Sequence, residues 1–452
     1  MTKPQLGYVR GGYRQQRTWY DGNGGFFPQN EQWFSLYDDA LALDRGQAWI
    51  EGGLTLPDWP VISFKYTYEF RDGQKDSTAW GSSTLTGGLG TRQIVPAFWD
   101  IDEKRHIFEG DIRHTIAKTD LGLGVRYEMM DNRNSLNLRL RPGEVSPLSL
   151  YTTSKEEVDA DIFNVHAFTH TRFNEKILFT TGYSFTTLDT DLSGSRIYGL
   201  GYDPIYDPIL ARQPGFIGLT GGSRMKQYVM NLNLMVTPWD AFQIVPSVRV
   251  EHRDLDGLAR STQTLALTQD PMLASSDQGV TEVAERLEAR YTGLTNWVFY
   301  ARGDWMQAQD DVSEQEVNSL TGALALARDT DNTRRAQKYT VGANWYPLRQ
   351  VNLDFQYYHK IRDNSYDYKY ATSTLIGFDQ YPGFLRAQDF TTDDANVRLT
   401  LRPLPKVTLV SRYDVQFSEV NQAAIGLAKL ESAEMRSHNA SPLLLLSRPQ
   451  LQ

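Results

Sequence analysis

Two histidines on one predicted strand are the first candidates for chemistry. His166 and His170 lie four residues apart within the predicted strand 161–173. On a helix this spacing can bring two imidazoles to one zinc ion. On a strand it separates them by about 13 Å, which is too far for a single metal ion. We therefore expect no metal site at these histidines.

Acidic pairs and one glycine-rich segment are the remaining candidates for a ligand site. The pairs are Asp100 with Asp102, Asp189 with Asp191, and Asp329 with Asp331, all predicted in or near loops. They lack the glycine and the bidentate glutamate of an EF-hand, so we interpret them as solvated surface, with loop-bound calcium as the alternative. The segment Gly87-Gly88-Leu89-Gly90 has no following Lys-Ser or Lys-Thr, and no Gly-x-Ser-x-Gly motif occurs. We predict no catalysis, no metal ligand and no cofactor in this chain.

The chemistry that remains is a set of charged side chains of both signs that alternate with apolar ones along predicted strands. An unpaired charge is very costly in hydrocarbon, so these residues must contact water, each other or a plug. We predict that they line the lumen of a membrane barrel. The candidates are Lys65, Glu69, Arg71, Glu109, Asp111, Arg113, Arg126, Glu128, Arg172, Arg249, Glu251, Arg286, Glu288, Arg290, Arg302, Asp304, Lys360, Arg398, Arg402, Arg412 and Asp414.

Strands with a period of two must position these charges. Ile62, Phe64, Tyr66, Tyr68 and Phe70 share one face of a strand, and the residues between them are polar. The same alternation recurs after residues 350 and 405. The apolar faces end in aromatic residues, as in the girdle of a membrane barrel. These are Tyr68, Phe70, Tyr183, Phe185, Trp305, Tyr357, Tyr413 and Phe417.

Short turns and long loops separate the strands in a repeat of roughly 54–65 residues. The predicted turns are 57–60, 118–120, 173–175, 238–240, 293–296, 347–350 and 403–406. The predicted long loops are 74–105, 193–224, 254–281, 310–335, 363–391 and 420–431. Short turns at one end and long loops at the other are typical of outer-membrane barrels, with the turns periplasmic and the loops extracellular.

We therefore predict an all-β chain, an antiparallel transmembrane β-barrel with about 14–16 visible strands. Residues 1–452 form one barrel domain of hairpin repeats in the outer membrane. The alternative is a soluble propeller, which would have four short strands per repeat instead of two strands of about 10–14 residues.

Bulk properties narrow the choice further. No stretch approaches the roughly 20 apolar residues of a membrane-spanning helix. A net charge of −9 disfavours nucleic acid as a partner. The chain has no cysteine, which excludes disulfides, thiolate metal sites and covalent haem attachment.

Both ends of the sequence are unusual for an exported barrel. Residues 1–4 lack the apolar region of a signal peptide. Residues 441–449 carry two prolines and do not alternate, and the sequence ends on Gln452 instead of an aromatic residue. We expect the visible strands to be part of a larger barrel.

The sequence contains distinctive short segments at 17–22, 68–77, 163–168, 171–176 and 194–199. Together with the hairpin repeat, they resemble the MtrB/PioB-like family of decahaem-associated outer-membrane barrels, and this diffuse likeness spans most of the chain. The resemblance implies a barrel that sheathes a periplasmic multihaem c-type cytochrome for transmembrane electron transfer, with outer-membrane lipid around it. The chain differs from the family in having fewer predicted strands and no N-terminal cysteine pair.

Two other functions remain open on the sequence alone. One is a passive diffusion porin for small polar solutes, since porin walls carry similar charges. The other is the barrel of a gated receptor whose plug lies outside this chain. An apolar lipid-transport tunnel does not fit a charged lumen.

Overall fold

The computed structural model describes residues 2–3, 6–20, 23–27, 32–35, 41–85, 91–139, 144–145, 151–199, 203, 205–207, 215–265, 268–373, 385–404, 406–424 and 445–446. Every regular element among these residues is a β-strand, which confirms the predicted fold class. In this part of the chain, no helix has the length and apolar character needed to cross a membrane.

The described residues include fifteen long strands, within the range predicted from the sequence. They are β2 (Gly7–Tyr20), β5 (Leu41–Leu54), β6 (Val61–Leu85), β7 (Thr91–Ile116), β8 (Thr119–Arg139), β10 (Tyr151–Asn174), β11 (Ile177–Gly199), β12 (Gly215–Trp239), β13 (Phe242–Leu265), β14 (Thr268–Tyr291), β15 (Trp297–Asn318), β16 (Leu324–Leu348), β17 (Val351–Ser373), β18 (Leu385–Leu404) and β19 (Val407–Ala424). The short strands are β1 (Thr2–Lys3), β3 (Asn23–Phe27), β4 (Gln32–Ser35), β9 (Glu144–Val145) and β20 (Leu445–Leu446).

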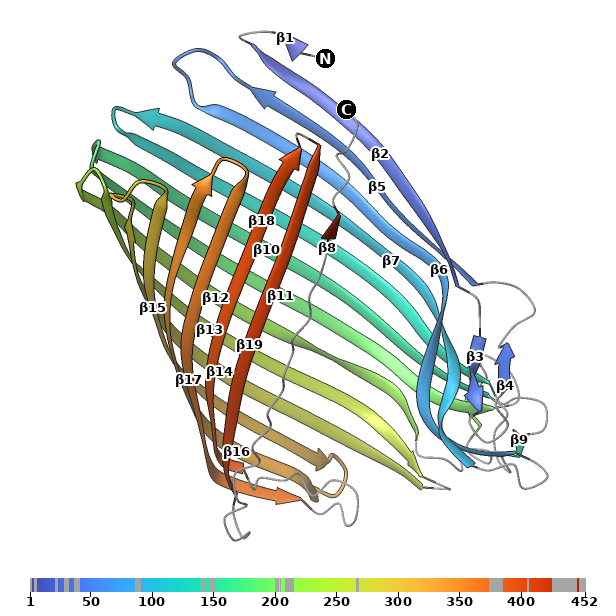
Figure 1. Ribbon diagram of the computed structural model, residues 1–452. Coiled ribbons are helices and arrows are strands. Elements are labelled where there is room, and N and C mark those ends of the chain that lie inside the picture. Colours follow the sequence, from blue (N-terminus) through green and yellow to red (C-terminus); the bar gives the residue numbers. More distant parts are fainter. Residues whose placement is uncertain are drawn as a thin grey trace.

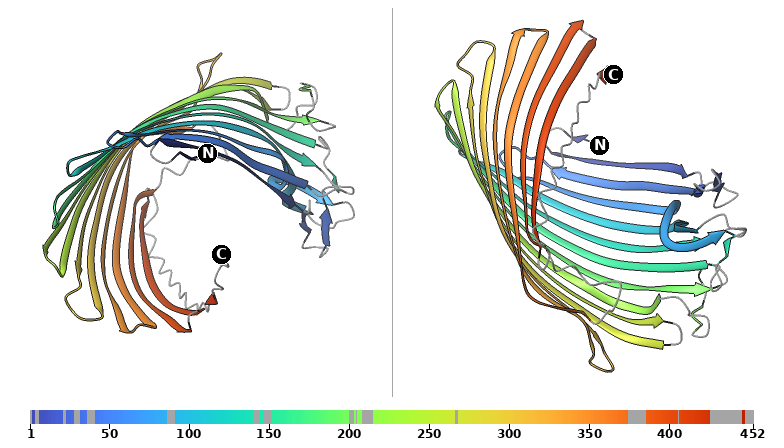
Figure 2. Two further views of the ribbon diagram at one scale, coloured as in Figure 1. Left: turned by 90° about the horizontal axis from the view of Figure 1, so that it is seen from above. Right: turned by 60° about the horizontal axis from the view of Figure 1, so that its bottom comes forward.

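Each long strand pairs antiparallel with the next long strand along the chain, in one continuous curved sheet (Figure 1). β2 and β19 are its two edges, and among the described residues they do not pair with each other. Figure 2 shows the sheet curving round between these edges. β20 pairs with β19 at Leu409 and Val410, and β1 pairs with β2 near its start.

The tight turns lie where the sequence predicts them. All seven predicted turns coincide with the short connections after β5, β7, β10, β12, β14, β16 and β18, although Pro405 falls outside the described residues. Asp58 (φ 63°) and Asn296 (φ 65°) adopt the left-handed conformation there. Aspartate and asparagine tolerate that region better than other residues with a side chain, so local chemistry helps to fix these turns.

The predicted long loops are mostly wrong. β6 continues to Leu85 and β7 begins at Thr91, so most of the predicted loop 74–105 is paired strand. The predicted loops 254–281 and 310–335 likewise lie largely within paired strands. The predicted loops 193–224, 363–391 and 420–431 are strand at 193–199, 215–224, 363–373, 385–391 and 420–424, and most of their other residues fall outside the described part of the chain. The long strands from β6 to β19 therefore have 18–26 residues, more than predicted. Their distal parts carry polar residues on both faces, which removed the alternation that marks a strand.

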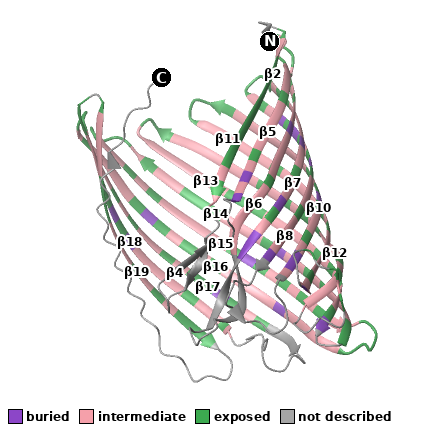
Figure 3. Cartoon of the chain, turned by 90° about the vertical axis from the view of Figure 1, so that its right-hand side faces the viewer, coloured by how far each residue is buried: buried purple, intermediate pink, exposed green. Residues whose placement is uncertain are grey.

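Alternation divides the sheet into two faces along the cross-strand register. One face, the apolar face, exposes apolar side chains such as Phe64, Met230 and Val341, which are 46–54% exposed. The other carries the predicted lumen residues and is called the charged face. Figure 3 shows exposed residues distributed along the strands over the whole sheet, as expected for a single curved layer. Buried hydrophobic residues are few and gather mainly on β5 and β7, at Leu41, Leu43, Ala97, Ile101 and Ile107.

Aromatic residues border the aliphatic band on both sides. Next to the turns, Trp239 stacks with Phe242 at 4.7 Å and Trp297 stacks with Trp345 at 5.3 Å between ring centroids. Toward the distal end, Tyr228 stacks with His252 at 6.3 Å, and the Trp305 indole donates to the Tyr339 hydroxyl. Two aromatic rims around an outward aliphatic band are the signature of a sheet that spans a bilayer.

Candidate functional site: the charged face of the sheet

All the predicted lumen residues lie on the charged face. Strand alternation and register place the groups from β6, β7 and β8 there together, and the same holds for β13 to β19. Two hollows, of about 510 and 490 Å³, open onto this face. The sequence predicted the shared face but not which residues meet, because that depends on register.

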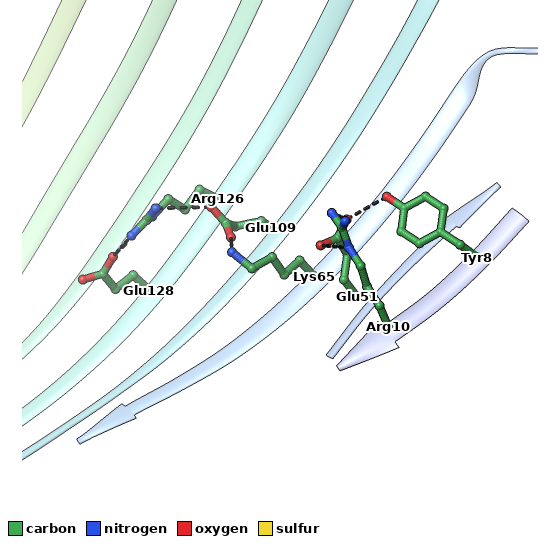
Figure 4. Close-up of polar contacts among 7 residues, drawn as sticks. All are labelled: Tyr8, Arg10, Glu51, Lys65, Glu109, Arg126 and Glu128. Atoms are coloured by element: carbon green, nitrogen blue, oxygen red, sulfur yellow. Dashed lines mark hydrogen bonds and ion pairs between the residues drawn. The ribbon is translucent and has the colours of Figure 1, made fainter. Parts of the chain in front are cut away.

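A row of alternating charges crosses five neighbouring strands at one level of this face. Arg10 of β2 is opposite Glu51 of β5, and Glu51 is opposite Lys65 of β6. Lys65 is opposite Glu109 of β7, which is opposite Arg126 of β8. Figure 4 shows these side chains approaching one another along the row. Each charge thus has an opposite charge on at least one side, which stabilises cross-strand pairs.

Direct contacts join most of the row. Arg10 donates to both carboxylate oxygens of Glu51, at 3.0 and 2.7 Å, and the Tyr8 hydroxyl donates to Glu51 Oε1 at 2.7 Å. The carboxylate of Glu109 accepts hydrogen bonds from Lys65 Nζ at 3.2 Å and from Arg126 Nη1 at 3.3 Å. A bidentate arginine–carboxylate pair is among the stronger polar contacts in proteins, so the edge strand β2 is held firmly to β5.

Glu128 anchors the end of the row. Its side chain is only 5% exposed and contacts Arg126 Nη2 at 2.7 Å and Arg105 Nε at 3.1 Å. A buried carboxylate needs such partners because an unpaired charge there is very costly.

The row continues without charge across the next three strands. Arg126 is opposite Asn164 of β10, which is opposite Thr186 of β11 and then Gln227 of β12. Asn164 donates to the hydroxyls of Ser184 and Thr186, each at 2.8 Å. The charged face therefore contains a neutral strip of amide and hydroxyl groups between two charged walls.

A second charged row crosses β14 to β17. Arg286, Asp304, Lys338 and Lys360 are successive cross-strand neighbours. Arg286 Nε and Arg302 Nε donate to the two oxygens of Asp304, at 2.6 and 2.8 Å. The hollow of about 490 Å³ lies over this row.

The other described sequence candidates, the two histidines and the three acidic pairs, all lie within strands. His166 and His170 are each near a carboxylate, Asp111 at 3.8 Å and Asp120 at 3.5 Å. The three acidic pairs lie within β7, β11 and β16, so their placement in or near loops is corrected. No group of three metal-binding side chains occurs among the residues described, and 87–90 falls outside them.

Sequence reasoning missed several members of the charged face. Arg10, Glu51 and Arg105 join the first row or its end, and Lys338 joins the second. Glycines weaken the alternation of β2 and β5, and Arg105 was assigned to a loop. Lys338 alternates clearly with Val341 and Tyr339, so its pattern could have identified it.

Known proteins offer little further identification. No protein-family model matches the chain, and no curated protein matches it by sequence. Among solved structures, the ferric yersiniabactin uptake receptor FyuA of Yersinia pestis gives a TM-score of 0.45 at 12% identity, over 93% of this chain and 68% of that one. The copper transporter OprC gives 0.42 at 10% identity, over 90% and 70%. The ferric-catecholate import receptor Fiu of E. coli gives 0.41 at 8% identity, over 92% and 74%.

These scores are too low to argue from, so the assignment rests on the molecule itself. Strands cross bilayers only in barrels, because every backbone polar group must be satisfied within the hydrocarbon. Antiparallel neighbours, an outward aliphatic band, two aromatic rims and a charged opposite face are the features of barrels in Gram-negative-type outer membranes. This chain is the wall of an outer-membrane β-barrel.

Proposed function

We propose that the charged face lines a lumen and encloses a folded polar protein, a periplasmic multihaem c-type cytochrome. The barrel would hold this partner across the outer membrane for electron transfer. The chain has no cysteine for covalent haem attachment, so the haems would belong to the partner. The family resemblance of the short sequence segments supports this choice of partner.

The neutral strip between two charged walls is the observation that carries the proposal. A wall of one sign would concentrate ions of the opposite sign. The row from Arg10 to Arg126 instead has no net charge once Glu128, the ion-pair partner of Arg126, is included. Asn164, Thr186 and Gln227 offer uncharged groups. The cores of protein interfaces are depleted in charge, so such a strip suits contact with a protein.

Co-purification tests the proposal. The full chain, extracted from outer membranes without denaturation, should carry haem absorbance in proportion to barrel protein. Thr186→Arg places a charge in the neutral strip and should reduce the haem recovered several-fold. Gln356→Arg places the same charge on the charged face of β17 and should leave it unchanged. Barrel that is folded but never associated with a c-type cytochrome would contradict the proposal.

A diffusion porin is the second candidate, favoured by the hollow of about 510 Å³ at the distal part of the charged face. Arg14, Arg45, Arg71 and Arg105 line it together with Glu69 and Glu103. Such charges are suited to contact with water. A porin would give stable conductance in planar bilayers as it is purified from outer membranes, whereas a sheath purified together with its partner would conduct only after the partner is removed.

A further inference from the structure

The second charged row contains a repulsive contact that the first row lacks. Along the first row the charges alternate in sign at every step from Arg10 to Arg126. Along the second, Arg286 and Lys338 flank Asp304, but the next step sets Lys338 directly opposite Lys360. Like charges directly opposite each other on neighbouring strands are destabilising.

The carboxylate in this row, Asp304, lies directly opposite Lys338 but forms its ion pairs with two arginines. Both oxygens of Asp304 already accept arginine donors, from Arg286 and Arg302. Lys338 Nζ lies 3.8 Å from the centroid of the Tyr358 ring, which favours a cation but carries no net charge. Among the described residues, no carboxylate forms an ion pair with Lys338 or Lys360.

The hollow over this row has an excess of positive charge. Five basic residues line its volume of about 490 Å³, against three acidic ones. The basic residues are Arg249, Arg286, Arg302, Lys338 and Lys360, and the acidic ones are Glu282, Glu285 and Asp304. Glu285 alternates onto the apolar face, so its carboxylate does not offset the cations on the charged face. A concave site lined mainly by one sign of charge concentrates the opposite ion.

We propose that this hollow binds a small oxyanion with two or more negative charges, held between Lys338 and Lys360. An anion there supplies the negative charge that alternation along the row lacks. Ammonium and guanidinium donors together suit phosphate or carboxylate oxygens. This inference is independent of whether a cytochrome occupies the lumen.

Inorganic pyrophosphate is a suitable probe for the full chain in detergent micelles. Calorimetric titration at constant ionic strength should show saturable binding that weakens about tenfold or more in the double variant Lys338→Gln, Lys360→Gln. Lys65→Gln removes a lysine of the same face whose charge is already paired with Glu109, and it should bind as the wild type does. Equal affinity in the double variant, or no saturable binding to the wild type, would overturn the proposal.

Thermal stability without pyrophosphate gives an independent readout. Lys360→Gln removes a like-charge neighbour and should raise the unfolding temperature, whereas Lys65→Gln breaks an ion pair and should lower it. Pyrophosphate should then raise the unfolding temperature of the wild type more than that of Lys360→Gln. If Lys360→Gln lowered the unfolding temperature as Lys65→Gln does, Lys338 and Lys360 would not repel each other, and the proposed anion site would be refuted.

Discussion

Arg10 of the edge strand β2 donates two hydrogen bonds to the carboxylate of Glu51 of β5, at 3.0 and 2.7 Å. The guanidinium side chain is 62% exposed and the carboxylate only 13%. This pair begins a row that ends at the buried Glu128 beyond Arg126. Side-chain contacts join β2 to β5 and β6 to β7 and β8, while Glu51 and Lys65 are opposite without a direct contact. The members of the row therefore differ in how much stability their loss removes.

Glu128 should be the most sensitive member of the row. Glu128→Gln leaves Arg105 and Arg126 without their buried counter-charge. We expect a loss of about 1–3 kcal/mol in the free energy of unfolding, below the value for a fully buried pair because both arginines are about 40% exposed. Denaturant titration of the barrel in detergent measures it. Glu175→Gln, in an exposed turn, is the control, and equal effects of the two substitutions would refute the special role of Glu128.

Charge on the apolar face should oppose membrane insertion. Val341 of β16 is 53% exposed within the aliphatic band. Val341→Arg should destabilise the inserted barrel by about 2–4 kcal/mol, because a cation there faces hydrocarbon. Refolding into vesicles, followed by gel mobility, checks this. Gln356→Arg on the opposite face should refold normally, and similar failure of both variants would contradict the assignment of the faces.

Acidic residues beyond the aromatic rim should make stability depend on pH. Asp256 of β13 and Asp277 of β14 are directly opposite each other. Asp256 lies four residues beyond His252, on the side away from the tight turn that precedes β13. A hydrogen bond with Asp256, which requires a proton on one carboxyl, raises the pKa of Asp277. The folded state therefore holds that proton more tightly than the unfolded chain, and stability falls as the pH rises from the ordinary aspartate pKa through the raised one.

Asp277→Asn removes this dependence. The variant should unfold at a higher temperature than the wild type at neutral pH, and the difference should shrink below about pH 4. Melting curves across pH 3–8 in detergent decide it, within the range where the barrel stays dispersed. An unchanged difference across the whole range would show that the two carboxyls do not share a proton.

The strand extensions beyond the membrane can be tested by disulfide formation, because the chain has no cysteine of its own. Asp72 and Asp102 are directly opposite on β6 and β7, and Asp102 lies inside the segment 74–105 that the sequence predicted to be a loop. The pair Asp72→Cys, Asp102→Cys should oxidise readily, since opposed residues on paired strands meet the distance a disulfide needs.

The mismatched pair Asp72→Cys, Lys104→Cys is shifted by two residues and should oxidise more slowly. A gel-shift time course with a mild oxidant separates the two cases. Equal rates would indicate a mobile loop in place of a fixed ladder.

The sequence predicts those parts of the structure that face two different environments. Between Ile62 and Phe70 one face meets lipid and the other does not, so alternation reveals both the strand and its orientation. Beyond Asp72 both faces of β6 are polar, so the sequence shows no alternation there. Backbone pairing with β7 and β9, which does not depend on side-chain polarity, continues the strand to Leu85.

For the candidate site, the sequence predicts on which face of the sheet the charged residues lie, but not which of them pair with each other. Alternation alone places Lys65, Glu109 and Arg126 on one side. Which charge meets which depends on register, and a shift of one residue would move every side chain to the other face. The opposition of Lys338 and Lys360 likewise follows from the length of a single turn between β16 and β17, not from either strand by itself.

The odd number of long strands limits how a ring could form. Since neighbours alternate in direction, the first and the fifteenth point the same way. Contact between β2 and β19 could therefore make only a parallel ladder, with slanted hydrogen bonds. A ring whose neighbours all run in opposite directions needs one strand, or three, between β2 and β19, and the short β20 already pairs antiparallel with β19 at Leu409 and Val410. If the two long edge strands stayed unpaired, lipid would meet unpaired backbone amide and carbonyl groups along β2 and β19.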